Sequence, residues 1–338
     1  MLNIVFAWEQ AVAKTTESEQ GMIASHRFPM YRPKNSLCNI DFILYLLKTK
    51  LGKNLLELAS PGGAGRNKTL GQSEFARLEI SLPPLSEQIK IVEILLTWDK
   101  AISTTEKLLI NSKQQKKALM QQLLTGKKRF SGFNLTWQKV HFDEVLNIEI
   151  GGTPLRTNPL YWDNNKATQN RWISIRDLKQ NIITDTKEYL SDLGVKNSNV
   201  KRIPAGSVIM SFKLTIGKAA VLGQDCYTNE AIAALLPKED SRILREYLIQ
   251  ALNVVNYESE IDQAIKGKTL NKEKLKRLKI PLPQVAEQKK ISGCLSAIDT
   301  QITNLDKQLT QLKQEKKSLM QQLLTGKQRV VIEGGKNG

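Results

Sequence analysis

The chain has 338 residues, 41% of them hydrophobic, so it can bury more than one core, and this argues against wholesale disorder. Lys and Arg outnumber Asp and Glu by 50 to 33, and the resulting formal charge of +17 favours a polyanionic partner, nucleic acid before an anionic membrane. No apolar run approaches the ~18 residues of a membrane span, and no basic leader opens the chain. The three cysteines show neither metal-binding nor CxxC spacing. We therefore expect a cytoplasmic protein with reduced thiols.

Residues 1–82 match the later part of a module that recurs in more complete form at 131–282. Aligning the two brings Pro33 opposite Pro237, and an apolar helix is expected after each proline. The first half of the module then has no counterpart before residue 1. We expect either a truncated first recognition domain or a missing half that another chain supplies.

Residues 83–130 and 283–330 are expected to form two long helices. The surrounding segment 77–129 recurs at 277–329 with a constant offset of 200, and 28 of its 53 positions are identical. A proline pair or single proline precedes each helix and a Thr-Gly dipeptide ends it, which are typical signals for a helix start and stop. The stretch between them, about 39 residues, would be roughly 58 Å long.

Apolar residues along both helices alternate at steps of four and three, the spacing of a coiled coil. Thr105, Ser112 and Lys116 interrupt the first stripe and Lys116 has a counterpart in Lys316. We expect the two helices to pack on each other as an antiparallel pair within one chain; two unrelated helices, each lying on its own domain, are the alternative. The expected stripe consists of Ile91, Leu95, Trp98, Ile102, Leu109, Leu119 and Leu123, and of Ile291, Leu295, Ile298, Ile302, Leu305, Leu309, Leu312, Lys316, Leu319 and Leu323.

The module at 131–282 reads as a mixed α+β domain. Short β-branched and apolar runs such as WISIRDL, SVIMSF and KAAVLG predict strands, and Gly-rich or Pro-rich turns separate them. Residues 241–265 have helical spacing. The predicted fold class is thus α+β, with recognition domains of mixed sheet and helix joined by the antiparallel long helices, and residues 331–338 form a tail.

No catalytic constellation is visible. Asn158-Pro159-Leu160-Tyr161 departs from the motif of amino-methyltransferases at its third position, and Gly267-Lys268-Thr269 lacks the upstream glycine of a phosphate-binding loop. The two histidines have no paired nucleophile or metal ligands, and the acidic residues are scattered. We expect a chain that is not an enzyme and holds no metal.

The doubled signature, LP…EQ followed by a heptad helix and K-K-x-L-M-Q-Q-L-L-T-G-K-x-R, resembles the specificity subunits of type I restriction-modification systems. The module at 131–276 resembles a target recognition domain of this family through Gly152-Thr153-Pro154, Tyr161-Trp162, Trp172-Ile173 and Ile216-Gly217-Lys218. The resemblance covers nearly the whole chain and departs at the N-terminus, where the family carries a complete first domain.

The resemblance implies a non-catalytic reader of a bipartite site in double-stranded DNA. Modification subunits would bring S-adenosylmethionine for adenine methylation, and restriction subunits would bring ATP and Mg²⁺ for translocation and cleavage. Self-association or a complementing fragment would supply the missing half-domain. Two alternatives are a coiled-coil scaffold without specific DNA reading and an inactive remnant of a specificity subunit.

Residues that read base edges are expected to be Arg, Lys, Asn or Gln on loops. A polar loop at 151–171, a turn at 213–218 and a Lys-rich turn around 268 meet this condition in the complete module, and residues 27–32 are the matching guess in the first. Lysines on the coiled coil are expected to be mainly solvated. The expected DNA-binding residues are Thr153, Arg156, Thr157, Asn158, Tyr161, Asn164, Asn165, Arg171, Lys213, Thr215, Lys218, Lys268, Arg27, Tyr31 and Arg32.

Overall fold

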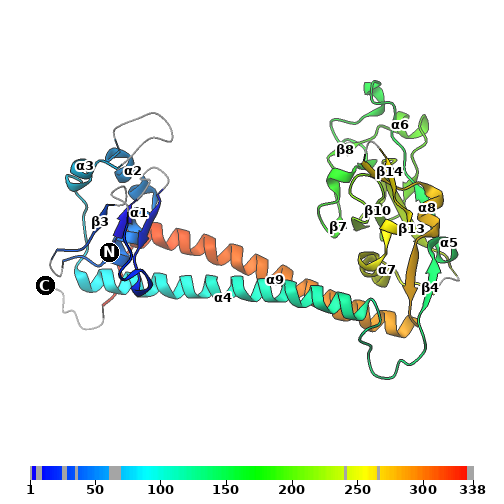
Figure 1. The fold of residues 1–338 in the computed structure, drawn as a ribbon. Coiled ribbons are helices and arrows are strands. Elements are labelled where there is room, and N and C mark those ends of the chain that lie inside the picture. Colours follow the sequence, from blue (N-terminus) through cyan, green and yellow to red (C-terminus); the bar gives the residue numbers. More distant parts are fainter. Residues whose placement is uncertain are drawn as a thin grey trace. The chain divides into compact units, whose positions relative to one another are not determined.

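The computed structural model describes residues 2–4, 10–24, 29–34, 37–60, 70–239, 242–264 and 267–332. The chain divides into two compact units, of which unit 1 contains residues 1–111 and 303–338 and unit 2 contains residues 112–302. Each unit therefore contains one segment of each long helix. Figure 1 labels the elements of both units.

The two long helices are present as predicted. Helix α4 spans Leu85–Leu123 and helix α9 spans Val285–Leu323. Each is followed by a glycine with a positive φ, 72° at Gly126 and 73° at Gly326, which is the left-handed conformation that commonly ends a helix. The mixed sheets and long helices confirm the predicted α+β class.

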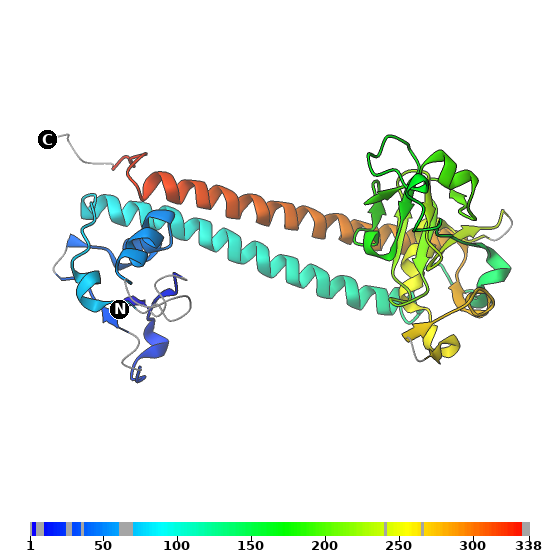
Figure 2. The same cartoon turned by 90° about the horizontal axis from the view of Figure 1, so that it is seen from above.

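The α4 and α9 segments pack side by side with opposite chain directions inside each unit (Figure 2). In unit 1 Lys316 pairs with Asp99 and Lys313 with Glu106 at 2.7 Å, so residue numbers rise on one helix as they fall on the other. In unit 2 Lys116 pairs with Asp299 at 2.6 Å. Every position of the expected stripe is buried or half-buried.

The polar interruptions of the stripe lie inside the seam between the helices. Thr105 and Ser112 are both 5% exposed, and the Gln301 amide lies 3.4 Å from the Ser112 hydroxyl. Lys116 was expected both to interrupt the stripe and to be mainly solvated, and its side chain is in fact only 22% exposed. Its ammonium group reaches Asp299 across the seam because its aliphatic stem can lie against the partner helix.

The described part of unit 1 contains, besides its segments of the long helices, a small sheet and three short helices. Strands β1 (Leu2–Ile4), β2 (Val12–Lys14) and β3 (Met30–Tyr31) form an antiparallel sheet in the order β2-β1-β3. The helix expected after residue 33 is divided into α1 (Ile40–Leu47) and α2 (Lys50–Leu58). Lys48 is the C-cap of α1, and the Thr49 side chain caps the start of α2. Helix α3 (Gln72–Ala76) follows. Phe42 and Leu46 of α1 pack on Ile91, Leu95 and the Leu323–Leu324 end of α9.

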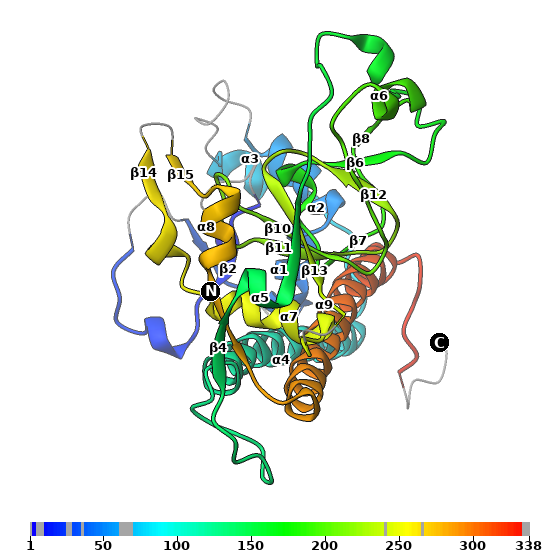
Figure 3. The same ribbon diagram turned by 90° about the vertical axis from the view of Figure 1, so that its right-hand side faces the viewer.

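Unit 2 is built on a five-stranded sheet in the order β5-β13-β10-β11-β7 and a four-stranded sheet in the order β8-β6-β12-β9. Pairing is antiparallel except between β11 and β7 and between β12 and β6. Two further pairs are β16 with β4 and β14 with β15, the latter a hairpin beside α8 (Figure 3). The strands are β4 (Gln138–His141), β5 (Leu146–Ile150), β6 (Arg171–Ile173), β7 (Ile182–Ile183), β8 (Glu188–Tyr189), β9 (Arg202–Ile203), β10 (Val208–Ser211), β11 (Ala219–Leu222), β12 (Cys226–Thr228), β13 (Ile232–Pro237), β14 (Asp262–Ala264), β15 (Gly267–Thr269) and β16 (Lys279–Leu282).

The helices of unit 2 are short. They are α5 (Phe142–Val145), α6 (Asp192–Lys196), α7 (Arg245–Ala251) and α8 (Lys272–Arg277). The helix expected over 241–265 is therefore wrong beyond Ala251, where the chain turns into 3₁₀ segments and then β14. The apolar residues there are used for packing, since Leu252 and Val255 are buried in the core that also holds Tyr247 and Leu248.

One glutamine in each unit joins the start of a long helix to the domain that packs on it. Gln288 accepts a hydrogen bond from the Leu244 N–H at 2.9 Å and donates to the carbonyls of Arg242 and Pro283 at 2.9 and 2.8 Å. Gln88 makes the same three bonds, to Asn39 N–H and to the Leu37 and Pro83 carbonyls. The repeated sequence thus encodes a repeated attachment.

A buried glutamate precedes each of these glutamines and pairs with an arginine. Glu287 binds Arg129 at 2.7 Å and accepts from the Trp137 indole at 2.9 Å, and Glu87 binds Arg329 at 2.5 Å. Hydrogen bonding from the Arg329 guanidinium holds the pKa of Glu87 below its usual value of 4.5. These pairs fix the segment that follows one long helix to the beginning of the other.

The lowered pKa of Glu87 predicts an acid-sensitive contribution to stability. A carboxylate whose pKa falls on folding stabilises the fold above its unfolded pKa and loses this effect as the pH drops through the folded value. We expect unit 1 to lose stability below pH 4.5, and Glu87→Gln to reduce that pH dependence. Hydrogen exchange of the α1 amides at pH 7 and pH 4 measures the difference, and an unchanged pH dependence in the variant would contradict the assignment.

Candidate nucleic-acid interface

The polar loop at 151–171 follows strand β5 and begins with two glycines. Any larger residue at either position would have to displace neighbouring atoms. The N–H of Gly151 donates to the Ile232 carbonyl at 3.2 Å and that of Gly152 to the Thr228 carbonyl at 2.9 Å. A Cβ at Gly151 would lie 2.0 Å from the Thr228 oxygen, and one at Gly152 would lie 2.2 Å from the Asn199 side chain. The loop is therefore anchored at its start by close backbone contact.

Arg156 is held on an aromatic platform within this loop. Its guanidinium carbon lies 3.9 Å from the ring centroid of Trp162 and 4.6 Å from that of Trp172, and the two rings meet edge to face at 5.2 Å. Trp172 is 1% exposed and its indole donates to the Gly152 carbonyl at 2.9 Å. Such stacking restricts the rotation of the guanidinium while leaving its edge accessible.

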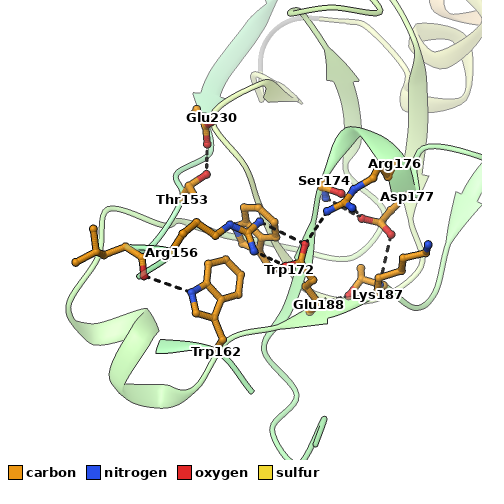
Figure 4. A network of polar contacts seen from close by, with 12 residues as sticks. Thr153, Arg156, Trp162, Trp172, Ser174, Arg176, Asp177, Lys187, Glu188 and Glu230 are labelled. Carbon is orange, nitrogen blue, oxygen red and sulfur yellow. Dashed lines mark hydrogen bonds and ion pairs between the residues drawn. The ribbon is translucent and has the colours of Figure 1, made fainter. Parts of the chain in front are cut away.

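Glu188 on β8 lies beside Arg156 and the two tryptophans, as Figure 4 shows. Its carboxylate forms ion pairs with both Arg156 and Arg176, the latter at 3.3 Å. Because two arginines share one carboxylate, the group keeps a net positive charge. The sequence did not single out Arg176, since WISIRDL was expected to be entirely strand, whereas residues 175–177 form a 3₁₀ turn that exposes this side chain.

A polar cavity of about 310 Å³ lies beside the platform. Arg156, Asn164 and Trp162 line it together with Lys187 and Glu188. The structure thus brings two predicted residues, Arg156 and Asn164, together with Lys187, which the sequence did not suggest. A signal for Lys187 could have been the charged residues around it, Asp185 and Glu188, where the chain leads into a short strand.

The turn at 212–218 between β10 and β11 presents a second group of basic side chains. Lys218 and Thr215 are exposed and Lys213 is half-exposed, with its ammonium 5.6 Å from the Phe212 ring centroid. Leu214 has a φ of 63° and is 72% exposed, so the turn carries its side chains outward. The Tyr257 ring packs beneath Gly217.

Hydrogen bonds of side chains and backbone bring these segments to one end of unit 2. The Thr153 hydroxyl donates to Glu230, and the Phe212 N–H donates to the Ala231 carbonyl at 3.0 Å, so the β12–β13 turn joins the loop to the turn. The Leu270 N–H donates to the Phe212 carbonyl at 3.1 Å, which places the end of hairpin β14–β15 at the same point. Lys268 lies on this hairpin, and its side chain is outside the described part.

The other predicted residues of the loop differ in their freedom to contact a ligand. Thr157 and Asn165 are exposed, and Tyr161 is half-buried. The Asn158 side chain accepts from the Leu160 N–H at 3.1 Å, so it caps the 3₁₀ turn 159–161. Arg171 begins β6 with its guanidinium 5.6 Å from the Tyr189 ring centroid and its Nε buried. Their assignment to DNA binding stays a prediction.

The three residues predicted in the first module lie in unit 1. Arg27 is outside the described residues. Arg32 is exposed, whereas the Tyr31 hydroxyl is buried and its ring packs on Phe75 at 4.7 Å. Desolvation raises the pKa of this phenol. Tyr31 therefore contributes to packing through its ring.

Two other kinds of feature are absent from the described ranges. No group of three or more His, Cys, Asp or Glu side chains in this part could hold a metal ion. Within the same residues, no helix is both long and apolar enough to cross a membrane.

The model of a protein family, the type I restriction modification DNA specificity domain, matches residues 2–112 and 134–314. These residues are most of the chain. The chain belongs to this family. Its function is accordingly DNA sequence recognition in a type I restriction-modification system, and a scaffold without DNA reading is not favoured.

Individual relatives agree with this membership. The chain is 23% identical over 353 aligned positions to the type I restriction enzyme MjaVIII specificity subunit of Methanocaldococcus jannaschii, covering 97% of this chain and 79% of the relative. It shares its fold with the HsdS subunit of Thermoanaerobacter tengcongensis, with a TM-score of 0.56 and 21% identity over 97% of this chain and 81% of that one. A second solved structure, described as the structural basis of complex assembly and conformational transition of the type I R-M system, has a TM-score of 0.60 and 21% identity. The match covers 94% of this chain and 79% of that one.

Proposed function

We propose that the chain is a non-catalytic specificity subunit that reads one part of a bipartite DNA site with unit 2. The observation that carries this proposal is the gathering of the 151–171 loop, the 212–218 turn and the β14–β15 hairpin at one end of the unit, joined through the Phe212 and Ala231 backbones. Two of these segments, the 151–171 loop and the 212–218 turn, present basic and amide side chains from a packed core.

The two groups at this end suit different contacts with DNA. Arg156 is oriented by stacking and by Glu188, and a fixed planar guanidinium can donate two parallel hydrogen bonds to a guanine edge. Lys213 and Lys218 are flexible point charges suited to phosphate. On contact with DNA, acceptor atoms of a base would replace Glu188 as the partner of Arg156. DNA without an acceptor at this position would not compensate for the lost ion pair, so Glu188 would also disfavour such DNA.

The wider assembly is part of the proposal. Modification subunits would bind the long helices and supply S-adenosylmethionine, and restriction subunits would supply the ATP- and Mg²⁺-dependent steps in the cytoplasm. Self-association, or association with a complementing fragment, is a further part of the proposal. A relative's structure from work on type I R-M complex assembly supports this direction.

Co-expression with the modification subunit from the same operon tests the proposal directly. A stable complex that methylates adenine in a split motif is the expected result, detected by gel filtration and methylation mapping. A complex that forms without methylating any DNA would point to an inactive remnant, and failure to form a complex would contradict the specificity-subunit assignment.

Alanine substitutions separate base reading from phosphate binding. Arg156→Ala is expected to cost about 1–3 kcal/mol of binding to the target and to relax the sequence preference at one position. Lys218→Ala is expected to weaken binding to all sequences and to lower the slope of log K against log salt by about 1. Fluorescence anisotropy with target and scrambled duplexes at several salt concentrations measures both effects.

The control is Arg202→Ala, which removes an exposed arginine of the same unit that pairs with Asp225 at 2.7 Å. We expect this variant to bind target DNA as the parent chain does. Unchanged binding in both Arg156→Ala and Lys218→Ala would reject the site assignment.

A further inference from the structure

Among the described residues, the sheet of unit 1 has an open edge where the corresponding sheet of unit 2 has a partner strand. Strands β3 and β13 are equivalent, because each precedes a helix whose start is bonded to the repeated glutamine, α1 to Gln88 and α7 to Gln288. Strand β13 lies between β10 and β5, whereas β3 is the last strand in the order β2-β1-β3 of the described sheet. An unpaired strand edge is a template for another strand.

An apolar cavity of about 220 Å³ lies next to this edge. Side chains from β3, α1, α3 and the segment before α4 line it, including Tyr31, Ile43, Phe75, Leu78 and Ile80. Ile80 is 39% and Leu82 is 37% exposed. Residues 79–82 form no strand in the described structure.

The equivalent residues of unit 2 are covered. The offset of 200 relates Phe75, Leu78 and Ile80 to Leu275, Leu278 and Ile280, and the bonds of the glutamines relate Ile43 to Leu248. These four residues of unit 2 are at most 1% exposed. The same apolar pattern is therefore buried in one unit and accessible in the other.

Residues 138–150 provide the cover in unit 2. Strand β4 pairs Val140 with Ile280, the Phe142 N–H donates to the Leu278 carbonyl at 2.8 Å, and strand β5 pairs Ile148 with Leu235. The α5 turn between them places Phe142 and Val145 in the same core. This strand–helical turn–strand element fills both the sheet edge and the apolar surface at once.

We propose that the open edge of unit 1, formed by β3, residues 79–82 and the adjoining cavity, binds a polypeptide element of the same kind as residues 138–150. The occupant is a strand–single helical turn–strand segment with apolar residues at the positions of Val140, Phe142, Val145 and Ile148, supplied from outside residues 1–338. A second copy of the chain is a poorer occupant, because its own residues 138–150 are already paired with β13 and β16.

A fluorescent peptide of residues 136–152 tests this docking site on the full chain. Saturable binding is expected, and a peptide with Phe142→Asp and Ile148→Asp should bind roughly 10- to 100-fold more weakly because it loses two apolar anchors. In the protein, Ile80→Asp should weaken peptide binding to a similar degree. Ile89→Asp is the matched control, since Ile89 is 42% exposed on α4 and lies outside the cavity lining.

A second form of the experiment does not depend on the affinity of a short peptide. Residues 131–152 joined to the N-terminus of the full chain by a Gly/Ser linker are present at high effective concentration. Hydrogen exchange at residues 79–82 should then slow, and Ile80→Asp should abolish the slowing.

Unchanged exchange in the fusion, or peptide binding that Ile80→Asp does not affect, would overturn the proposal. A parent chain that is dimeric and becomes monomeric with Ile80→Asp would also overturn it, since the occupant would then be a second copy. These outcomes do not depend on DNA binding, so they are distinguishable from a failure of the proposed function.

Discussion

Replacing Gln288 with leucine is expected to lower the free energy of unfolding of unit 2 by about 2–4 kcal/mol, because it leaves buried backbone groups without partners. The amide is 0% exposed and satisfies the Leu244 N–H and the carbonyls of Arg242 and Pro283. Leucine has a similar volume but offers neither a donor nor an acceptor. Hydrogen exchange of the α7 amides under native conditions measures the loss.

Two matched variants show whether the effect is specific. Gln308→Leu changes an exposed glutamine of the same helix and should leave unit 2 unaffected. Gln88→Leu removes the equivalent bonds in unit 1 and should destabilise α1 instead of α7. Equal loss in Gln308→Leu and Gln288→Leu would mean that the glutamine does not attach the domain to the helix.

Trp172→Ala is expected to have the largest effect on unit 2, about 3–5 kcal/mol of its free energy of unfolding. The indole is 1% exposed, bonds to the Gly152 carbonyl and lies beneath Arg156. Alanine would leave a cavity, free the start of the 151–171 loop and remove part of the platform. We expect specific DNA binding to fall with stability, measured by urea unfolding and anisotropy on the same preparation.

Trp162→Ala separates packing from recognition. Trp162 is half-buried and its ring centroid lies 3.9 Å from the Arg156 guanidinium carbon, so its loss should cost less stability than that of Trp172 while still disordering Arg156. Target binding should therefore decrease more than the free energy of unfolding. If DNA binding in both variants only follows stability, the platform has no role in recognition.

The structure brings together only some of the residues predicted to bind DNA. Arg156 and Asn164 meet in one cavity, and the 213–218 turn lies at the same end of unit 2. The sequence did not suggest their neighbours Arg176, Lys187 and Glu188, since these residues come from segments expected to be strand or given no role. Glu188 is 32 residues from Arg156 and no local pattern relates them.

The sequence by itself determined the long helices, their seam and the duplication. Helical periodicity, proline and glycine signals and heptad spacing are local properties, so α4 and α9 and their buried stripes could be predicted within a few residues. Identity at a fixed offset likewise indicated two modules that each end in the same helical element. The polar seam positions Thr105 and Ser112 were visible as interruptions of the stripe.

Only the tertiary structure decided where the short elements end and which side chains meet. Thr49 divides one predicted helix and Leu252 ends another, because packing of their apolar residues against a sheet outweighs helical propensity. The Arg156–Glu188 pair, the Gln88 and Gln288 bonds and the open edge of β3 all join residues far apart in the chain. Loop paths and strand neighbours fix such contacts, and neither is encoded in the spacing of residues along the sequence.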